Sequence, residues 1–66
     1  MFDKNLLKSE FVASGVSYEK AAEMLKMNKT TLSRKINGYT EWTLSEIQSF
    51  ADAFGKETAI KIFFSE

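Results

Sequence analysis

A chain of 66 residues that contains neither cysteine nor histidine has few ways to hold itself together. A domain of about this size buries only about 60% of the surface that its unfolded chain exposes, and usually needs a disulfide, a metal, a partner or very regular helix packing. Disulfides and the usual zinc sites are excluded here, so we expect one domain over residues 1–66 that binds no metal or cofactor. Thiol nucleophiles and histidine bases are excluded too, which argues against an enzyme.

The sequence carries no membrane or export signal. No apolar run approaches the roughly 18 residues that a membrane span needs, and the N-terminal MFDKNLLKSEF lacks the basic-then-apolar layout of a secretory signal. The lack of cysteine is in keeping with a reducing compartment. We therefore expect a soluble, cytoplasmic protein with no membrane partner and no small-molecule substrate.

Charged residues balance overall but are unevenly distributed. Nine basic and nine acidic side chains give a net charge of zero, which favours no class of partner. Residues 39–66 hold five acidic and two basic side chains. The segment 26–38, which we call the basic segment, holds no acid and four cations: Lys26, Lys29, Arg34 and Lys35. Such a cluster is either an ordinary solvated helix face or a surface for a polyanion.

Glycines and capping residues divide the chain into helices. Three glycines stand at roughly equal intervals, each after a run with helical periodicity, and N-capping side chains precede the first four runs. The glycines are Gly15, Gly38 and Gly55, and the caps are Asp3, Ser17, Asn28 and Thr43. The tail is ambiguous, because Ile60-Lys61-Ile62 could alternate as a strand, but we favour a helix there. We expect an all-α fold with helices at about 4–14, 18–25, 29–37, 44–54 and 57–64.

The start of the helix at 44–54 carries the strongest local signal. Thr43 and Glu46 have the spacing of a capping box, and Trp42 and Ile47 have that of a hydrophobic staple. Both devices predict the same helix start. An apolar stripe then follows along the helix at Leu44, Ile47, Phe50, Ala51 and Phe54.

The helix at 29–37 has an unusually narrow apolar edge. Leu32 and Ile36 share one side of it, while Thr30 and Arg34 point the opposite way. Threonine and serine are mediocre helix formers, so stability alone does not explain them. Hydroxyls and cations without a carboxylate suit a groove lined by phosphates and base-edge acceptors. The preceding short helix carries small side chains at Ala21 and Ala22, which would allow the two helices to cross closely, as in a helix-turn-helix.

The stretch VSYEKAAEMLKMNKTTLSRKING (16–38) and the helix that follows it resemble the lambda-repressor and Cro type helix-turn-helix of phage and bacterial transcriptional regulators. The resemblance covers nearly the whole chain. It implies a compact five-helix domain in a bacterial host cell that binds double-stranded operator DNA, usually as a dimer. It places the base-reading positions at Lys29, Thr30 and Arg34. Contacts to the DNA phosphates are then expected from Ser17, Tyr18, Thr31, Ser33, Lys35 and Asn37.

Two residues depart from the family pattern. Lys26 stands in the turn where the family commonly has glycine, so a residue with a Cβ atom would adopt a positive φ. Lys35 stands where the family usually has a further apolar core residue, which leaves Ile36 as the anchor of that helix.

The C-terminus offers a candidate protein interface. Ile62, Phe63 and Phe64 are more apolar bulk than a last turn readily hides, although core packing is the plainer interpretation. Neighbours on a helix lie about 100° apart, so at most one of the two phenylalanines points squarely inward. We expect this group to join two copies of the chain, or to bind a cognate phage repressor. In the second case the protein would be an antirepressor or modulator, an alternative that its neutral charge supports.

Overall fold

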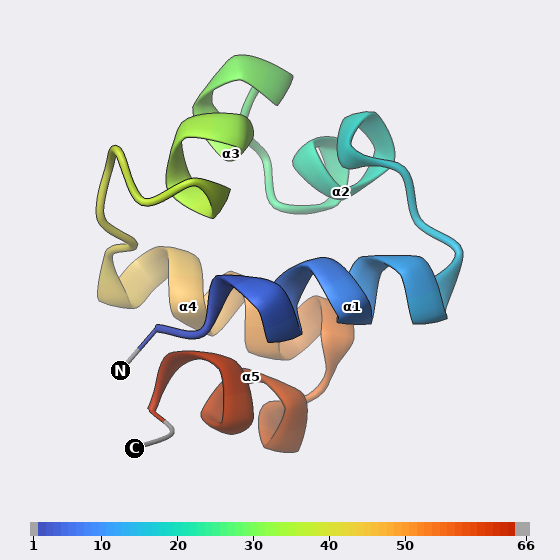
Figure 1. The fold of residues 1–66 in the computed structure, drawn as a ribbon, viewed down its shortest axis with the longest axis vertical. Helices are drawn as coiled ribbons and strands as arrows, with labels where there is room; N and C mark the ends of the chain where they lie inside the picture. Colours follow the sequence, from blue (N-terminus) through green and yellow to red (C-terminus); the bar gives the residue numbers. More distant parts are fainter. Residues whose placement is uncertain (1, 65–66) are drawn as a thin grey trace.

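The computed structural model describes residues 2–64, which form five helices and no strand. They are α1 (Lys4–Ser14), α2 (Tyr18–Met24), α3 (Lys29–Ile36), α4 (Leu44–Phe54) and α5 (Lys56–Phe63). Figure 1 shows α2 and α3 on one side of the molecule, with α1 and α4 in the middle and α5 on the opposite side. The predicted all-α fold is confirmed, and the ambiguous tail is helical.

Helix boundaries follow local backbone chemistry. The second and third helices end one residue earlier than predicted, because Leu25 and Asn37 are C-caps, and α5 begins one residue earlier, at Lys56. All four predicted N-caps accept a backbone N–H three residues on: Leu6 to Asp3, Lys20 to Ser17, Thr31 to Asn28 and Glu46 to Thr43.

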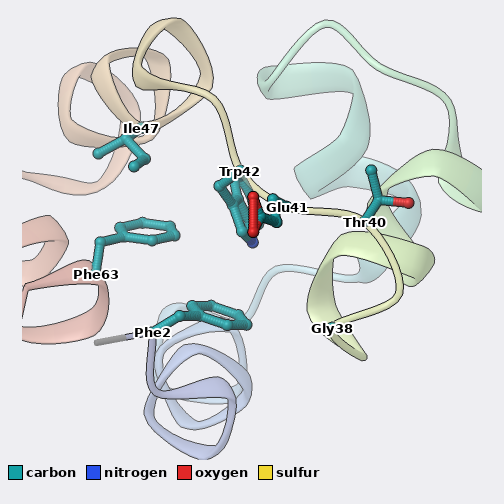
Figure 2. A pocket seen from close by; sticks show the side chains of 7 residues that line it. All are labelled: Phe2, Gly38, Thr40, Glu41, Trp42, Ile47 and Phe63. Carbon is teal, nitrogen blue, oxygen red and sulfur yellow. The ribbon is translucent and has the colours of Figure 1, made fainter.

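The start of α4 contains the predicted capping box. The Thr43 hydroxyl accepts from the Glu46 amide at 3.2 Å, and the Glu46 carboxylate accepts from the Thr43 amide at 2.9 Å. Trp42 and Ile47, the predicted staple, are both partly buried against the core. Figure 2 shows them around a hollow, with Phe63 beside them. These contacts fix the direction in which the α3–α4 loop enters α4.

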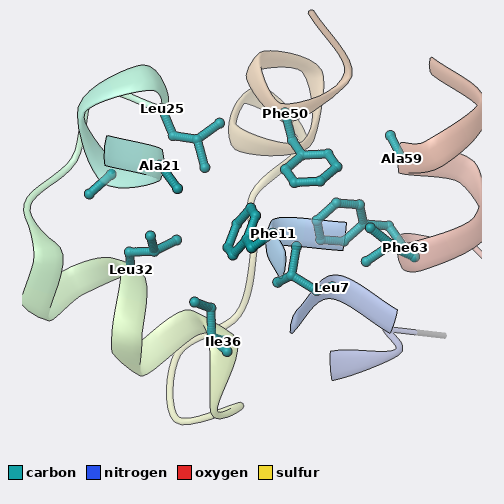
Figure 3. Packing of buried hydrophobic residues seen from close by; sticks show 11 residues of the cluster. Leu7, Phe11, Ala21, Leu25, Leu32, Ile36, Phe50, Ala59 and Phe63 are labelled. Carbon is teal, nitrogen blue, oxygen red and sulfur yellow. The ribbon is translucent and has the colours of Figure 1, made fainter. Parts of the chain in front are cut away.

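A small core joins all five helices (Figure 3). Its largest fully buried side chains are Leu7 and Phe11 of α1, Leu32 and Ile36 of α3, Phe50 of α4 and Ile62 of α5. Leu44 differs from the prediction, since it is 79% exposed. Leu44 and the half-buried Ala51 are seven residues apart and so point in the same direction from α4. Both lie at the edge of the apolar stripe that faces α5, and not at the centre of the stripe.

The two ends of the described chain lie against each other. The Asp3 amide donates to the Ile62 carbonyl at 2.8 Å, and the Phe2 and Phe63 rings stack with centroids 5.6 Å apart. The N-terminal segment therefore covers the inner face of α5.

Removing the capping hydroxyl tests how much the α4 start contributes. We expect Thr43→Ala to lower the free energy of unfolding by about 1 kcal/mol, the usual value of an N-cap, measured by urea denaturation. Ser45→Ala, an exposed change in the same turn, is the control and should lie within about 0.5 kcal/mol of wild type. Equal stabilities for all three proteins would show that the box contributes nothing.

Candidate nucleic-acid interface

α2 and α3 are joined by a tight turn with an unusual backbone. The Lys26 amide donates to Glu23 O at 3.2 Å and the Met27 amide to Ala22 O at 3.0 Å, the pattern of a Schellman helix end. Lys26 has φ +59°, which confirms the expected positive φ at a residue with a Cβ atom. Ala21 and Ala22 are 0% and 3% exposed, so small side chains lie between the two helices. The turn and the alanines set the angle at which α3 leaves α2.

α3 is anchored along one edge only. Leu32 and Ile36 are completely buried, whereas Lys29, Thr30 and Arg34 are exposed. The three predicted base-reading residues therefore lie on the solvent side of the helix. Thr31 and Ser33 are half-buried on its flanks. The outward face presents cations and hydroxyls and no carboxylate, a set that can meet phosphates and base-edge acceptors.

Lys35 corrects the sequence prediction. Its side chain is only 6% exposed, and its ammonium lies 2.9 Å from the Glu46 carboxylate and 3.0 Å from the Glu41 carbonyl. The expectation that it contacts phosphate is wrong, because this cation is buried and already paired. Its aliphatic stem occupies the position where the family usually has an apolar core residue. Lys35 therefore joins α3 to the start of α4.

The Glu46 carboxylate is shared between the capping box and the ion pair. Partial burial by itself would raise the pKa of this carboxyl, but the hydrogen bond from the Thr43 amide and the nearby Lys35 ammonium outweigh it. The pKa of Glu46 is therefore held below its ordinary value of 4.5. The charged form is the one that the folded state stabilises.

The remaining predicted phosphate ligands lie at helix ends. Ser17 is exposed at the start of α2, and Asn37 is exposed at the end of α3, where its side-chain amide donates to Ser33 O at 2.9 Å. Tyr18 is half-buried, with its ring edge against Phe11 at a centroid distance of 5.9 Å. Their contacts with DNA stay predictions.

The sequence predicts that the loop 39–41 lies near the DNA backbone, but it assigns Tyr39 no contact of its own. Tyr39 follows Gly38, whose φ of +83° ends α3, and its amide donates back to Arg34 O at 2.9 Å. Tyr39 is 83% exposed and lines a shallow depression with Ser33, Arg34 and Asn37. The signal was present, because a residue directly after the glycine of a Schellman helix end is carried back toward the last turn.

The C-terminal prediction is partly wrong. Ile62 and Phe63 are 0% and 6% exposed and belong to the core, because α5 turns this side toward α1, α4 and the Trp42 ring. They are not available to a partner. Phe64 is 55% exposed, which agrees with the expectation that at most one phenylalanine points inward. It borders an apolar hollow between α4 and α5 that Leu44 and Ile60 also line.

Other kinds of site were sought over the same residues. Within 2–64, no group of three or more acidic side chains is arranged to hold a metal ion. None of the five helices is both long and apolar enough to cross a membrane.

The chain was compared with known protein families. The family model described as helix-turn-helix matches residues 7–61, which include all of α2, the turn, α3 and α4. No curated protein and no solved structure is significantly similar to the chain.

The ion pair between α3 and α4 predicts an acid dependence of stability. Because the folded-state pKa of Glu46 is lowered, its contribution is complete above the unfolded-state value and is lost as pH falls through the folded one. At pH 7 we expect Glu46→Gln to cost about 1.5–3 kcal/mol, the range of a hydrogen bond to a charged group. Denaturation at a series of pH values should show this deficit shrinking below pH 4.5. The exposed Glu57→Gln is the control, and a deficit that does not vary with pH would contradict the assignment.

Proposed function

The chain belongs to the helix-turn-helix family of lambda-repressor and Cro type, a family of DNA-binding regulators that are typically not enzymes, and from this premise we propose a specific role for it. It is a transcriptional regulator of phage Cro or repressor type that binds operator DNA with α3 in the major groove.

The outward face of α3 carries this proposal. Lys29, Thr30 and Arg34 are exposed on one side of a helix whose other side is fixed by buried residues. The major groove of B-DNA admits one α-helix, and its walls are phosphates while its floor presents base-edge acceptors and donors. A rigid helix with an acid-free, cationic outer face is complementary to that groove in shape and charge.

Each residue then has a role that follows from its position. Arg34 projects one turn beyond the start of α3, and its planar fork matches the O6 and N7 acceptors of guanine. Lys29 and Thr30 lie in the first turn, where helices of this type contact base edges. Ser17, Tyr18, Thr31, Ser33 and Asn37 position the domain on the phosphates.

Arg34→Ala tests base recognition. The probe is a duplex selected by the wild-type protein from a random library, compared with a random duplex of equal length by fluorescence anisotropy. We expect a loss of about 1–3 kcal/mol on the selected duplex, a smaller loss on random DNA, and relaxed preference at one base pair per half-site. An equal loss on both duplexes would make Arg34 a phosphate contact and defeat the assignment.

The salt dependence of binding separates the two lysines of α3. We expect the Lys29 ammonium to touch a phosphate at the groove wall as well as a base edge. Lys29→Ala should then reduce the slope of log affinity against log salt by about one unit, because that phosphate contact and its released counterion are lost. Lys35→Met should leave the slope unchanged, since that ammonium is paired with Glu46. Lys61→Ala, an exposed cation on α5, serves as the control for a change in net charge. A reduced slope for Lys35→Met, or an unchanged one for Lys29→Ala, would refute this division of roles.

We further propose that two copies of the chain act together. A single recognition helix makes few contacts, and regulators of this type gain affinity by binding two half-sites about one helical turn apart. The surface that we assign to this pairing is the α4–α5 hollow with its exposed neighbours Leu44, Ile60 and Phe64. It leaves the outer face of α3 open to DNA. Two-fold pairing of identical chains is also the commonest form of oligomer.

Phe64→Ser tests this surface. Because Phe64 is 55% exposed, we expect the thermal melt to remain nearly unchanged while self-association in analytical ultracentrifugation is lost. Val12→Ser is the matched control, since Val12 is apolar and 82% exposed but lies on α1. If wild type sediments as a monomer and Phe64→Ser instead abolishes binding to a cognate repressor, the antirepressor alternative replaces the dimer.

A further inference from the structure

An aromatic ring stands in solvent at the end of α3, on a backbone that is held firmly. Tyr39 is 83% exposed. The amides of Gly38, Tyr39 and Thr40 all donate back into the last turn, at 3.3 Å to Lys35 O and at 2.9 and 3.4 Å to Arg34 O. The residue at this place in a Schellman helix end usually packs an apolar side chain onto the preceding turn. Tyr39 keeps the backbone of that motif without the packing.

The surroundings of Tyr39 favour an anionic ligand. The shallow depression that it lines is completed by Ser33, Arg34 and Asn37, which bring a hydroxyl, a guanidinium and an amide but no carboxylate. A helix C-terminus by itself repels anions. Here the carbonyls of Ser33, Arg34 and Lys35 are all occupied by amide donors, which reduces that repulsion.

The burial of Lys35 gives this tyrosine a further importance. The one lysine near the end of α3 is paired with Glu46 and cannot reach a ligand. Residues just beyond the end of a helix that lies in the groove come to the groove's edge, where the phosphates run. Besides Asn37, a donor at this edge can come from Tyr39 in the segment that follows α3.

We propose that the Tyr39 hydroxyl donates a hydrogen bond to a backbone phosphate of the bound DNA, next to the nucleotide that Arg34 reads. This contact fixes how the C-terminal end of α3 sits in the groove. The inference rests on the proposed function and adds to it a backbone contact outside the helix-turn-helix itself.

Tyr39→Phe removes the hydroxyl and keeps the ring. We expect binding to weaken about tenfold on both the selected and the random duplex, because a phosphate contact does not depend on sequence. The salt slope should stay at the wild-type value, since a neutral phenol releases no counterion. Circular dichroism melts should coincide, because the side chain is 83% exposed. Tyr39→Leu, which lacks both ring and hydroxyl, should bind no better than Tyr39→Phe.

Neutral methylphosphonates placed one at a time along the selected duplex identify the phosphate. One position should weaken binding of wild type and have no effect on Tyr39→Phe. If Tyr39→Phe binds DNA as tightly as wild type does, the proposal is overturned, whatever the affinity of Tyr39→Leu. Weak binding by Tyr39→Leu alone would indicate a contact made by the ring. Arg34→Ala would still show its sequence-dependent loss in that case, so the proposed function would stand. If wild type bound neither duplex at low salt, the proposed function and the Tyr39 contact would both be contradicted.

Discussion

The contact between Phe11 of α1 and Phe50 of α4 organises the molecule. Both rings are nearly inaccessible, their centroids are 6.3 Å apart, and further rings pack around them: Tyr18, Trp42, Phe54 and Phe63. This aromatic cluster ties α1, the start of α2, the α3–α4 loop, α4 and α5 into one body. Aromatic side chains bury more area per residue than any others, which suits a chain with no covalent or metal cross-link. α3 contributes no ring to the cluster and is attached to it by aliphatic side chains.

α3 is therefore held by a mixed set of contacts that the sequence revealed only in part. Its end near α2 is fixed by Leu32 against the small alanines, and its far end by Ile36 and the Lys35–Glu46 pair. A buried ion pair gives little net stability over apolar side chains of the same size, but it is directional. The Lys35 ammonium donates both to Glu46 at the start of α4 and to the Glu41 carbonyl in the loop, so it fixes the end of α3 relative to both. The same glutamate thus holds both the helix cap and the neighbouring helix.

How far the sequence predicts this structure depends on whether a feature is local. The N-caps, the capping box and the glycine helix ends were predicted because each depends on residues within four or five positions. The positive φ of Lys26 was expected from the family resemblance. The burial of Lys35, Ile62 and Phe63 was not predicted, because it depends on side chains from other parts of the chain. Three of the four cations of the basic segment, Lys29, Arg34 and Lys35, were expected to contact DNA, and the structure withdraws Lys35 from that set. The loop that holds Tyr39 was expected near the DNA backbone, but no contact was assigned to Tyr39 because its exposure depends on how the whole chain packs.

The junction between Phe2 and Phe63, with its hydrogen bond from Asp3 to Ile62, nearly closes the described chain into a ring. Figure 1 shows both ends on the side of the molecule away from α3. Closely placed ends are what circular permutation needs, because a short linker can bridge them while new ends open in an exposed turn such as the one at Gly15. In a circularly permuted chain α3 should keep its position, because that position depends on the side chains that meet in the core and not on where the chain begins.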